Sequence, residues 1–295
     1  MHRHIIHSAS LTFCLTGLLT ANEAIDIIDT SSHELTPASK MSLDDISTQL
    51  ENPLTSLWSI TLENSYRSIS GNSVNGSTEA NVLNFQPGMP IPMANDFTFI
   101  ARPVFPLVTS PVLDTNGDTI KHTTGIGDIQ MLSLYGPDKS KGFVWGLGTT
   151  MKFPTASSEF IGAGKWQAGP AAMAFHFGDK WTLGALAEHW WSFAGDSDRA
   201  HTNETNIKYI VRHKLPDAWS IGAGPTIAIN WKEKPNNRYT IPVGLGLSKT
   251  AKFGELPIKF RLEAHYNLVR PDNIGQEWQI LFRIAPVIPS PFSQP

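Results

Sequence analysis

Cysteine, long apolar runs and an excess of charge are all scarce in this 295-residue sequence. The single cysteine, Cys14, lies in a stretch that we expect to be removed, so the mature chain excludes disulfides, zinc–thiolate sites and cysteine nucleophiles. The formal net charge is only −3, and no polybasic field indicates nucleic-acid binding. Hydrophobic residues make up 41% of the chain, which is too few for a helical membrane protein.

The first 24 residues are typical of a secretory signal peptide. Arg3 precedes an uncharged apolar run over residues 9–19, and small residues follow at Ala21 and Ala24. The run is too short for a stable transmembrane helix. We therefore expect residues 1–24 to be cleaved, with an approximate cleavage position, after export of the chain.

Residues 25–53 are predicted to form a periplasmic leader with one short helix. Ser42 is placed to cap this helix together with Asp45 three residues later, and Pro53 ends it. The helix is amphipathic, and its apolar side carries Leu43, Ile46 and Leu50. It is either a small plug or latch, or an ordinary helix that precedes the main fold.

The centre of the chain alternates in steps of two. Between Phe143 and Phe153 every second residue is mostly apolar or aromatic, and the residues between them are small or polar. The stretch from Trp181 to Phe193 repeats the pattern, with aromatic residues at both ends of the apolar row. Large aromatics belong in the core of a soluble sheet, whereas in a membrane barrel they gather at the two water interfaces. Because a closed barrel leaves no unpaired backbone edge in lipid, this pattern predicts an outer-membrane β-barrel.

Twelve segments are long enough to cross a bilayer, which takes about 9–11 residues of tilted strand. They cover approximately residues 54–69, 81–93, 97–112, 125–136, 143–153, 166–177, 181–194, 205–215, 218–231, 238–252, 258–270 and 276–288. Short turns and long polar connections alternate through the first eight, as periplasmic turns and extracellular loops do. We therefore predict an all-β fold, a single antiparallel transmembrane barrel of about twelve strands over residues 54–288. We expect residues 289–295 to form a C-terminal extension.

Charged residues on the polar faces of these strands are expected to line the barrel lumen, since a lipid-facing charge would cost roughly 2–4 kcal/mol at the midplane. They form either a selectivity lining biased toward anions or ion pairs that tie the wall together. The lumen-lining candidates are Glu63, Arg102, Asp128, Lys152, Glu188, Lys208, Arg212, Lys214, Lys259, Arg261, Glu263, His265 and Arg283.

Glycines on the same faces indicate space for a solute, because a closed barrel would be filled with large interdigitating side chains. They are Gly146, Gly148, Gly184, Gly222, Gly224, Gly244 and Gly246.

Catalytic and metal-binding patterns are weak. His265 and Glu263 share one face, but no serine in a recognisable nucleophile setting accompanies them. The stretch Asp114–Asp118 imitates the start of a calcium loop, but its glycine comes early and no glutamate follows at the required distance. We therefore predict no enzyme activity, no cofactor and no metal.

Three strings, in order, carry a family resemblance: Gly125–Ile129, Lys165–Pro170, and Gly184–Ala187 followed by Trp191–Asp196. They resemble the Gram-negative outer-membrane proteins named for the meta-pathway of phenol degradation, over about Leu50 to Ile288. The resemblance implies a channel or transporter for small compounds, aromatic or apolar ones among them, without catalytic residues. Glu188 departs from the pattern, which has a neutral polar residue there.

Two functions compete at this point. The resemblance and the lumen glycines favour an outer-membrane channel, whereas the lumen charges and the helix near residues 42–50 favour a closed barrel with a structural or surface-interaction role. An outer-membrane hydrolase is a third, less favoured function. The expected location is the bacterial outer membrane, and the expected partners are its lipid, a small-molecule solute and the barrel-assembly machinery, without nucleic acid.

Overall fold

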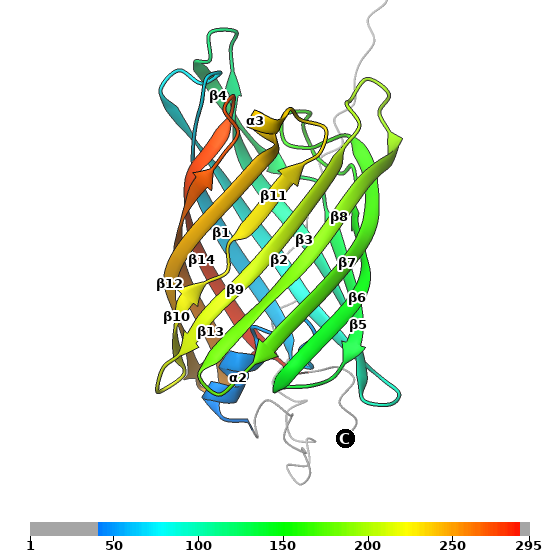
Figure 1. The fold of residues 1–295 in the computed structure, drawn as a ribbon, viewed down its shortest axis with the longest axis vertical. Helices are drawn as coiled ribbons and strands as arrows, with labels where there is room; N and C mark the ends of the chain where they lie inside the picture. Colours follow the sequence, from blue (N-terminus) through cyan, green and yellow to red (C-terminus); the bar gives the residue numbers. More distant parts are fainter. Residues whose placement is uncertain (1–40, 290–295) are drawn as a thin grey trace, which may run out of the picture. The chain divides into compact units, whose positions relative to one another are not determined.

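The computed structural model describes residues 41–289, which form a closed antiparallel β-barrel (Figure 1). The predicted signal peptide, residues 25–40 of the predicted leader and residues 290–295 of the predicted extension lie outside the described residues. The helices are α2 (Leu43–Gln49) and α3 (Pro235–Arg238), and neither is long and apolar enough to span a bilayer. The strands are β1 (Trp58–Ser70), β2 (Ser77–Met93), β3 (Phe97–Leu113), β4 (Thr119–Ile126), β5 (Gln130–Pro137), β6 (Gly142–Lys152), β7 (Lys165–Phe177), β8 (Trp181–Gly195), β9 (Asn203–Lys214), β10 (Trp219–Ala223), β11 (Thr226–Asn230), β12 (Tyr239–Phe253), β13 (Leu256–Val269) and β14 (Gly275–Ile288).

These strand segments occupy twelve positions around the barrel. Neighbouring positions are antiparallel, and β14 pairs with β1 to close the sheet. Both β4 and β5 pair with β3, so together they make one position. In the same way β10 and β11 both lie between β9 and β12. The predicted twelve-stranded antiparallel barrel with a short helix before it is confirmed.

The two interruptions correct the predicted strands 125–136 and 218–231. The first lies opposite Pro106 of β3, which has no N–H to donate to the strand ladder. The second contains Pro225, which lacks a donor for the same reason. The predicted long loop 113–124 is also shorter than expected, because β4 extends the β3–β4 hairpin into it.

The barrel begins later than predicted, at Trp58 rather than at residue 54. Two polar side chains bond locally and turn the backbone away from the sheet. The carboxamide oxygen of Asn52 accepts the N–H of Leu54 at 3.0 Å, and the hydroxyl of Thr55 accepts the N–H of Leu57 at 3.1 Å. Such local bonds offer the backbone an alternative to the strand ladder.

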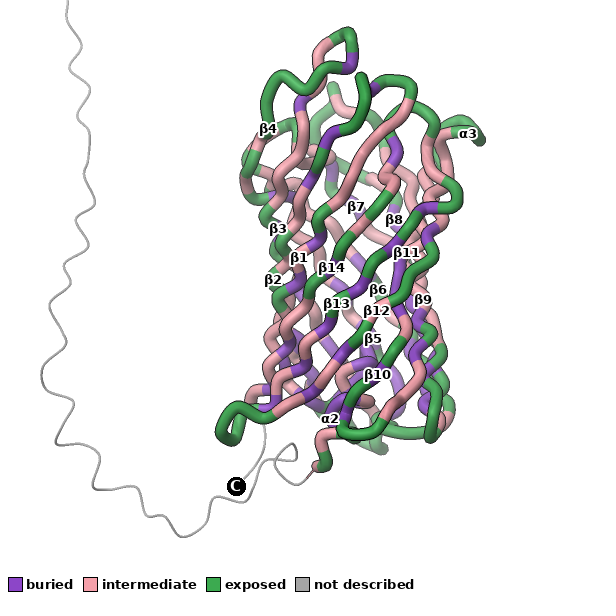
Figure 2. Tube along the Cα trace, turned by 90° about the vertical axis from the view of Figure 1, so that its left-hand side faces the viewer, coloured by how far each residue is buried: buried purple, intermediate pink, exposed green. Residues whose placement is uncertain are grey.

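The two faces of the wall differ as the alternation predicts. On β6, Phe143 and Leu147 are 60% and 59% exposed on the outer surface, whereas Val144 between them is fully buried inside. Figure 2 shows the same change between buried and exposed positions along the strands. On β8, the aromatic residues Trp181 and Phe193 stand at the two ends of the outer row. The outer surface therefore fits a lipid-facing band with aromatic edges.

A charge placed in the middle of this band should destabilise the barrel. We expect Leu147→Arg to lower the free energy of unfolding by about 2–4 kcal/mol, because the guanidinium would face hydrocarbon. The measurement is a denaturant titration of the protein folded into lipid vesicles. Ile120→Arg is the matched control: Ile120 is 61% exposed on β4, beside the exposed Lys121 and His122, so its loss should stay within about 0.5 kcal/mol. Equal losses would mean that β6 does not face lipid.

Candidate functional site

Residues 42–57, which we call the N-terminal plug, fold into one end of the barrel (Figures 1 and 2). Its helix α2 begins after Ser42, whose hydroxyl accepts the N–H of Asp45 at 3.1 Å, as predicted. On the apolar side of the helix, Ile46 is fully buried and packs with Leu57 and with Val287 of β14. The helix is therefore fixed against the inner wall.

Leu54 packs the N-terminal plug against an apolar part of the inner wall. Its side chain is fully buried, which for a leucine contributes about 1.5–3 kcal/mol. The cluster around it consists of inward-facing residues of β3 and β5 to β9, namely Ile100, Leu132, Leu134, Val144, Ala171, Met173, Phe175, Phe177, Leu186 and Ile210.

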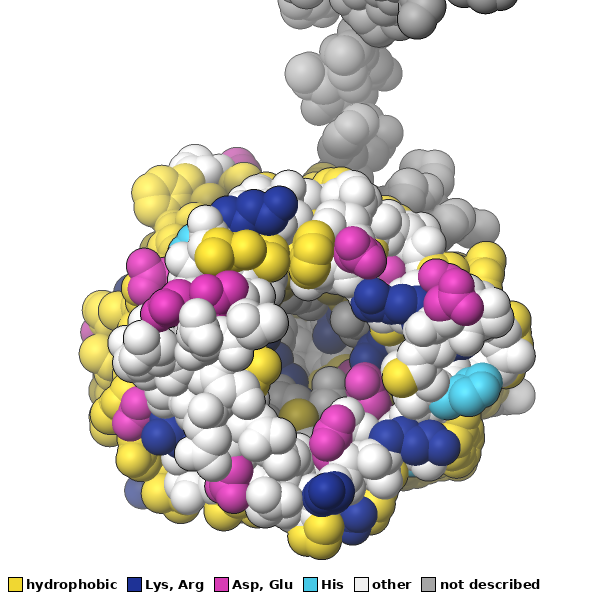
Figure 3. All heavy atoms as spheres, turned by 90° about the horizontal axis from the view of Figure 1, so that it is seen from above, with side chains coloured by type: hydrophobic (Ala, Val, Ile, Leu, Met, Phe, Trp, Pro, Cys, Tyr) yellow, Lys and Arg dark blue, Asp and Glu magenta, His cyan; other side chains and the backbone are white. Residues whose placement is uncertain are grey.

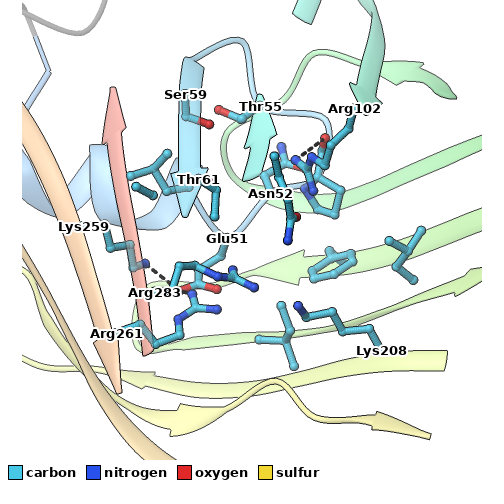
Figure 4. A pocket seen from close by; sticks show the side chains of 17 residues that line it. Glu51, Asn52, Thr55, Ser59, Thr61, Arg102, Lys208, Lys259, Arg261 and Arg283 are labelled. Carbon is cyan, nitrogen blue, oxygen red and sulfur yellow. Dashed lines mark hydrogen bonds and ion pairs between the residues drawn. The ribbon is translucent and has the colours of Figure 1, made fainter. Parts of the chain in front are cut away.

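Glu51 joins the N-terminal plug to strands β9 and β13 through ion pairs (Figure 4). Its Oε1 lies 2.5 Å from Lys259 Nζ, 2.5 Å from Arg261 Nη2 and 3.4 Å from Arg212 Nε. Lys259 also donates to the carbonyl of Ser47 at 2.6 Å. Burial raises the pKa of Glu51, but the three cations outweigh burial and hold this pKa well below its ordinary value. The stabilisation is therefore present above the ordinary glutamate pKa of about 4.3 and is lost as the pH falls through the lowered value.

A second buried carboxylate, Glu263, neutralises two of the same cations. It accepts a hydrogen bond from Arg212 and lies 3.4 Å from Arg261 Nε. It also lies 2.8 Å from His265 Nε2. The break between β10 and β11 frees the N–H of Gly224 from the strand ladder, and this N–H donates to Glu263 at 2.9 Å. Two carboxylates, three cations and a histidine thus form one buried network.

Two further pairs neutralise predicted lumen residues within the wall. Arg283 of β14 forms an ion pair with Glu63 of the adjacent β1. Lys152 Nζ lies 2.7 Å from Glu204 and 4.0 Å from the centre of the Trp190 ring. The first pair joins adjacent strands, whereas the second connects β6 with β9 across β7 and β8.

Arg102 of β3 and Glu188 of β8 point into the interior and are partly buried. Arg102 Nη2 donates to the carbonyl of Pro53 in the N-terminal plug at 3.4 Å. The Thr150 hydroxyl donates to Glu188 at 2.9 Å and accepts the indole N–H of Trp190 at 3.0 Å. Glu188 therefore has a hydrogen-bonding role that a neutral polar residue could also fill.

Asp128 and Lys214 lie toward the two ends of the barrel rather than in mid-lumen. The Asp128 carboxylate accepts the N–H groups of Ala156 and Ala163 at 3.1 and 2.7 Å, so it fastens a long loop. Lys214 Nζ donates to the carbonyl of Gly178 in a short turn at 2.8 Å. Both residues hold connections, and the expected lumen position is wrong for Asp128.

Lys208 and Arg67 are interior cations whose side chains have no partner among the described residues. Within residues 41–289, the side chains of Lys208 and Arg67 make no hydrogen bond or ion pair, and Arg67 Nε is buried without an acceptor. Figure 4 shows Lys208 pointing into the space beside the N-terminal plug. Arg67 is not among the lumen-lining candidates predicted from the sequence, although it follows Glu63 and Ser65 in steps of two along β1.

Space inside the barrel narrows from the loop end toward the N-terminal plug. Figure 3 looks into the loop end and shows a central hollow with basic and acidic side chains in its wall. A cavity of about 380 Å³ lies at this mouth, and one of about 370 Å³ lies next to it, with Thr240 lining both. Lys208 lines the second cavity and a third of about 80 Å³. Glu51 lines this third cavity and a last one of about 20 Å³.

Most of the space expected beside the interior glycines is filled. A methyl group on Gly146 would collide with Leu54 of the N-terminal plug, and one on Gly184 would collide with the ring of Phe175. These glycines admit large neighbours rather than a solute. Gly224, by contrast, borders the cavity of about 370 Å³.

Comparisons with known proteins agree with the β-barrel fold. No curated protein matches the chain. The COG4313 outer membrane channel from Pseudomonas putida F1 is similar in structure, with a TM-score of 0.59 at 14% identity, over 79% of this chain and 96% of that chain. The NanC porin gives a TM-score of 0.48 at 12% identity, over 78% and 98% of the two chains. At these identities the likeness to the COG4313 channel shows a shared fold.

The sequence itself defines the relationship more closely. A family model described as "Putative MetA-pathway of phenol degradation" matches residues 63–246, from the middle of β1 into β12. This match covers more than half of the 295 residues, and the chain belongs to that family.

Proposed function

We propose that the chain is an outer-membrane channel for small solutes and that the N-terminal plug closes its periplasmic end. The observation that carries the proposal is the polar interior space, which is wide at the loop end and narrows to the plug. The similar structure from Pseudomonas putida F1 is called an outer membrane channel, which supports the same role. We assign no catalysis to His265, whose Nε2 is taken up by Glu263 in the buried network.

Small aromatic or apolar compounds are the cargo that the family description suggests, because it names a pathway of phenol degradation. The apolar cluster around Leu54 would offer such compounds a surface once the plug has moved. Movement of the plug is required, since the two cavities beside it are smaller than a phenol molecule needs.

Reconstitution in liposomes tests the channel proposal. The processed protein and a variant lacking residues 42–53 are compared for ion conductance and for uptake of phenol and glucose. We expect the shortened variant to conduct and the full protein to conduct only in brief openings. If neither protein passes ions or solutes above the protein-free background, the channel proposal fails.

A closed barrel with a structural or surface-interaction role is the second candidate. The buried network of Glu51, which fixes the plug from both the helix and the wall, favours it. The same reconstitution separates the two functions, because a closed barrel conducts only after residues 42–53 have been removed and never in the full protein.

The orientation of the barrel in the membrane can be tested with single cysteines. We expect Ser197→Cys, in the long connection after β8, to react with a membrane-impermeant maleimide on intact cells. Asp179→Cys, in the short turn between β7 and β8, should react only after the outer membrane is broken. Both side chains are exposed, so accessibility from outside is the difference between them. The parent chain, whose one cysteine lies in the predicted signal peptide, is the control. Labelling of Asp179→Cys alone on intact cells would reverse the orientation.

A further inference from the structure

The cavity of about 370 Å³, which we call the vestibule, has the size and the chemistry of a ligand site. It lies between β1, β9, β11, β12, β13 and β14, on the loop side of the N-terminal plug. Small-molecule sites usually measure about 300–1,000 Å³, so the vestibule lies near the lower end of that range. Its wall is mainly charged, amide and hydroxyl side chains.

The charge of the vestibule is unbalanced toward cations. Both Lys208 and Arg67 line it, and neither side chain has a hydrogen bond or ion pair with any residue from 41 to 289. The one carboxylate in its wall, Glu63, is already paired with Arg283. A buried donor without an acceptor costs about 1–3 kcal/mol, and Arg67 Nε is such a donor. An anion entering the vestibule would supply the missing acceptor.

The rest of the wall offers neutral hydrogen bonds. Within the described residues, the side chains of Asn206, Thr226 and Thr240 make no hydrogen bond, although all three line the vestibule. Asn267 Oδ1 is buried there without a donor. An apolar ring filling this space would bury amide and hydroxyl groups without partners, which is unfavourable. A ligand with several hydroxyl groups would satisfy them.

We propose that the vestibule binds small hydrophilic organic acids, of the class of a monocarboxylate with a polyhydroxylated body such as a sugar acid. The carboxylate is held by Lys208 and Arg67, and the hydroxyl groups bond to the amides and threonines of the wall. This inference rests on the proposed channel function, and for the vestibule it replaces the aromatic or apolar cargo that the family description suggests with a hydrophilic solute class. It makes the vestibule the step that selects a solute before the plug opens.

Calorimetric titration of the full protein in detergent tests the proposal with three probes: D-glucuronate, D-glucose and benzoate. Glucuronate and glucose share a hydroxylated body and differ in charge, whereas benzoate is a carboxylate with an apolar body. We expect saturable binding of glucuronate, at least about tenfold weaker binding of glucose, and weaker binding at high salt. Equal affinities for glucuronate and glucose, or tighter binding of benzoate, would overturn the proposal on the unmodified protein alone.

Substitutions of the two vestibule cations test whether glucuronate binds in the vestibule. Lys208→Met and Arg67→Met each keep most of the side-chain volume and should each weaken glucuronate binding at least about tenfold. Lys252→Met is the matched control, because Lys252 is exposed on β12 near a short turn and should leave the affinity unchanged. Heat-dependent gel mobility checks that each barrel is folded. Unchanged affinity in both folded vestibule variants would place any binding elsewhere.

The binding experiment and the conductance experiment can fail separately. Calorimetry in detergent needs no passage through the barrel. Glucuronate binding without conductance would therefore contradict the channel proposal and indicate a closed barrel that binds organic acids. Conductance without glucuronate binding would contradict only the proposed solute class.

Discussion

Replacing Glu51 by glutamine should open the barrel. The neutral amide leaves Lys259 and Arg261 buried together without the carboxylate that now lies 2.5 Å from each. Removing one member of a buried ion pair costs about 3–5 kcal/mol, and release of the N-terminal plug would relieve that cost by letting water reach the cations. A shift of this size raises the population with a displaced plug by at least about a hundredfold. Single-channel recording in planar bilayers should therefore show a ratio of open to closed time at least about a hundredfold above that of the unmodified protein.

The control for this experiment is Glu255→Gln. Glu255 is exposed in the short turn between β12 and β13, so its substitution makes the same chemical change away from the network. Its open probability should match that of the unmodified protein. A Glu51→Gln barrel that is folded and stays closed would mean that Leu54 and the helix α2 hold the plug without help from charge.

Replacing Glu263 by glutamine should destabilise the whole barrel rather than the plug alone. Glu263 neutralises Arg212 and Arg261, which lie on different strands, and also accepts the N–H of Gly224. Because both arginines are buried on strands of the barrel, which cannot be displaced as the plug can without opening the sheet, we expect a loss of about 3–5 kcal/mol in the free energy of unfolding. Urea titration in lipid vesicles, followed by tryptophan fluorescence, measures this loss.

A matched ion pair at the loop end provides the comparison. Glu277 lies 3.1 Å from Arg270, and both side chains are about one third exposed, at 34% and 35%. Water screens such a pair, so Glu277→Gln should cost at most about 1 kcal/mol. Similar losses for the two substitutions would contradict the buried network as a source of stability.

The strand pattern was predictable because it depends on local alternation. A residue such as Leu147 must face lipid once its neighbours Gly146 and Gly148 face inward, and the sequence shows this directly. The helix start at Ser42 is local in the same sense, since its cap bonds to Asp45 only three residues away. Strand ends and breaks were harder, because Asn52 adds a single hydrogen bond and Pro106 removes one, and neither change alters the alternation.

The candidate site was only partly predictable. The step of two puts Lys208, Arg261 and Glu263 on the polar faces of their strands, but it cannot say which of them are neutralised. That depends on Glu51, which lies outside every strand and carries no periodic signal. The interpretation of the interior glycines failed for a related reason: the space beside Gly146 is taken by a residue of the plug, far from it in sequence.

The N-terminal plug also constrains the order in which the protein can assemble. Glu51 is 208 residues from Lys259 and 210 from Arg261, so the contacts that seat the plug are among the most distant in the chain. Closing so long a loop is slow, and its cost is met only after β13 is present. Synthesis and export begin at the N-terminus, yet the plug near that end is the last part to reach its final contacts. We therefore expect the charge contacts of Glu51, which complete the seating of the plug, to form only after the final hairpin is in place.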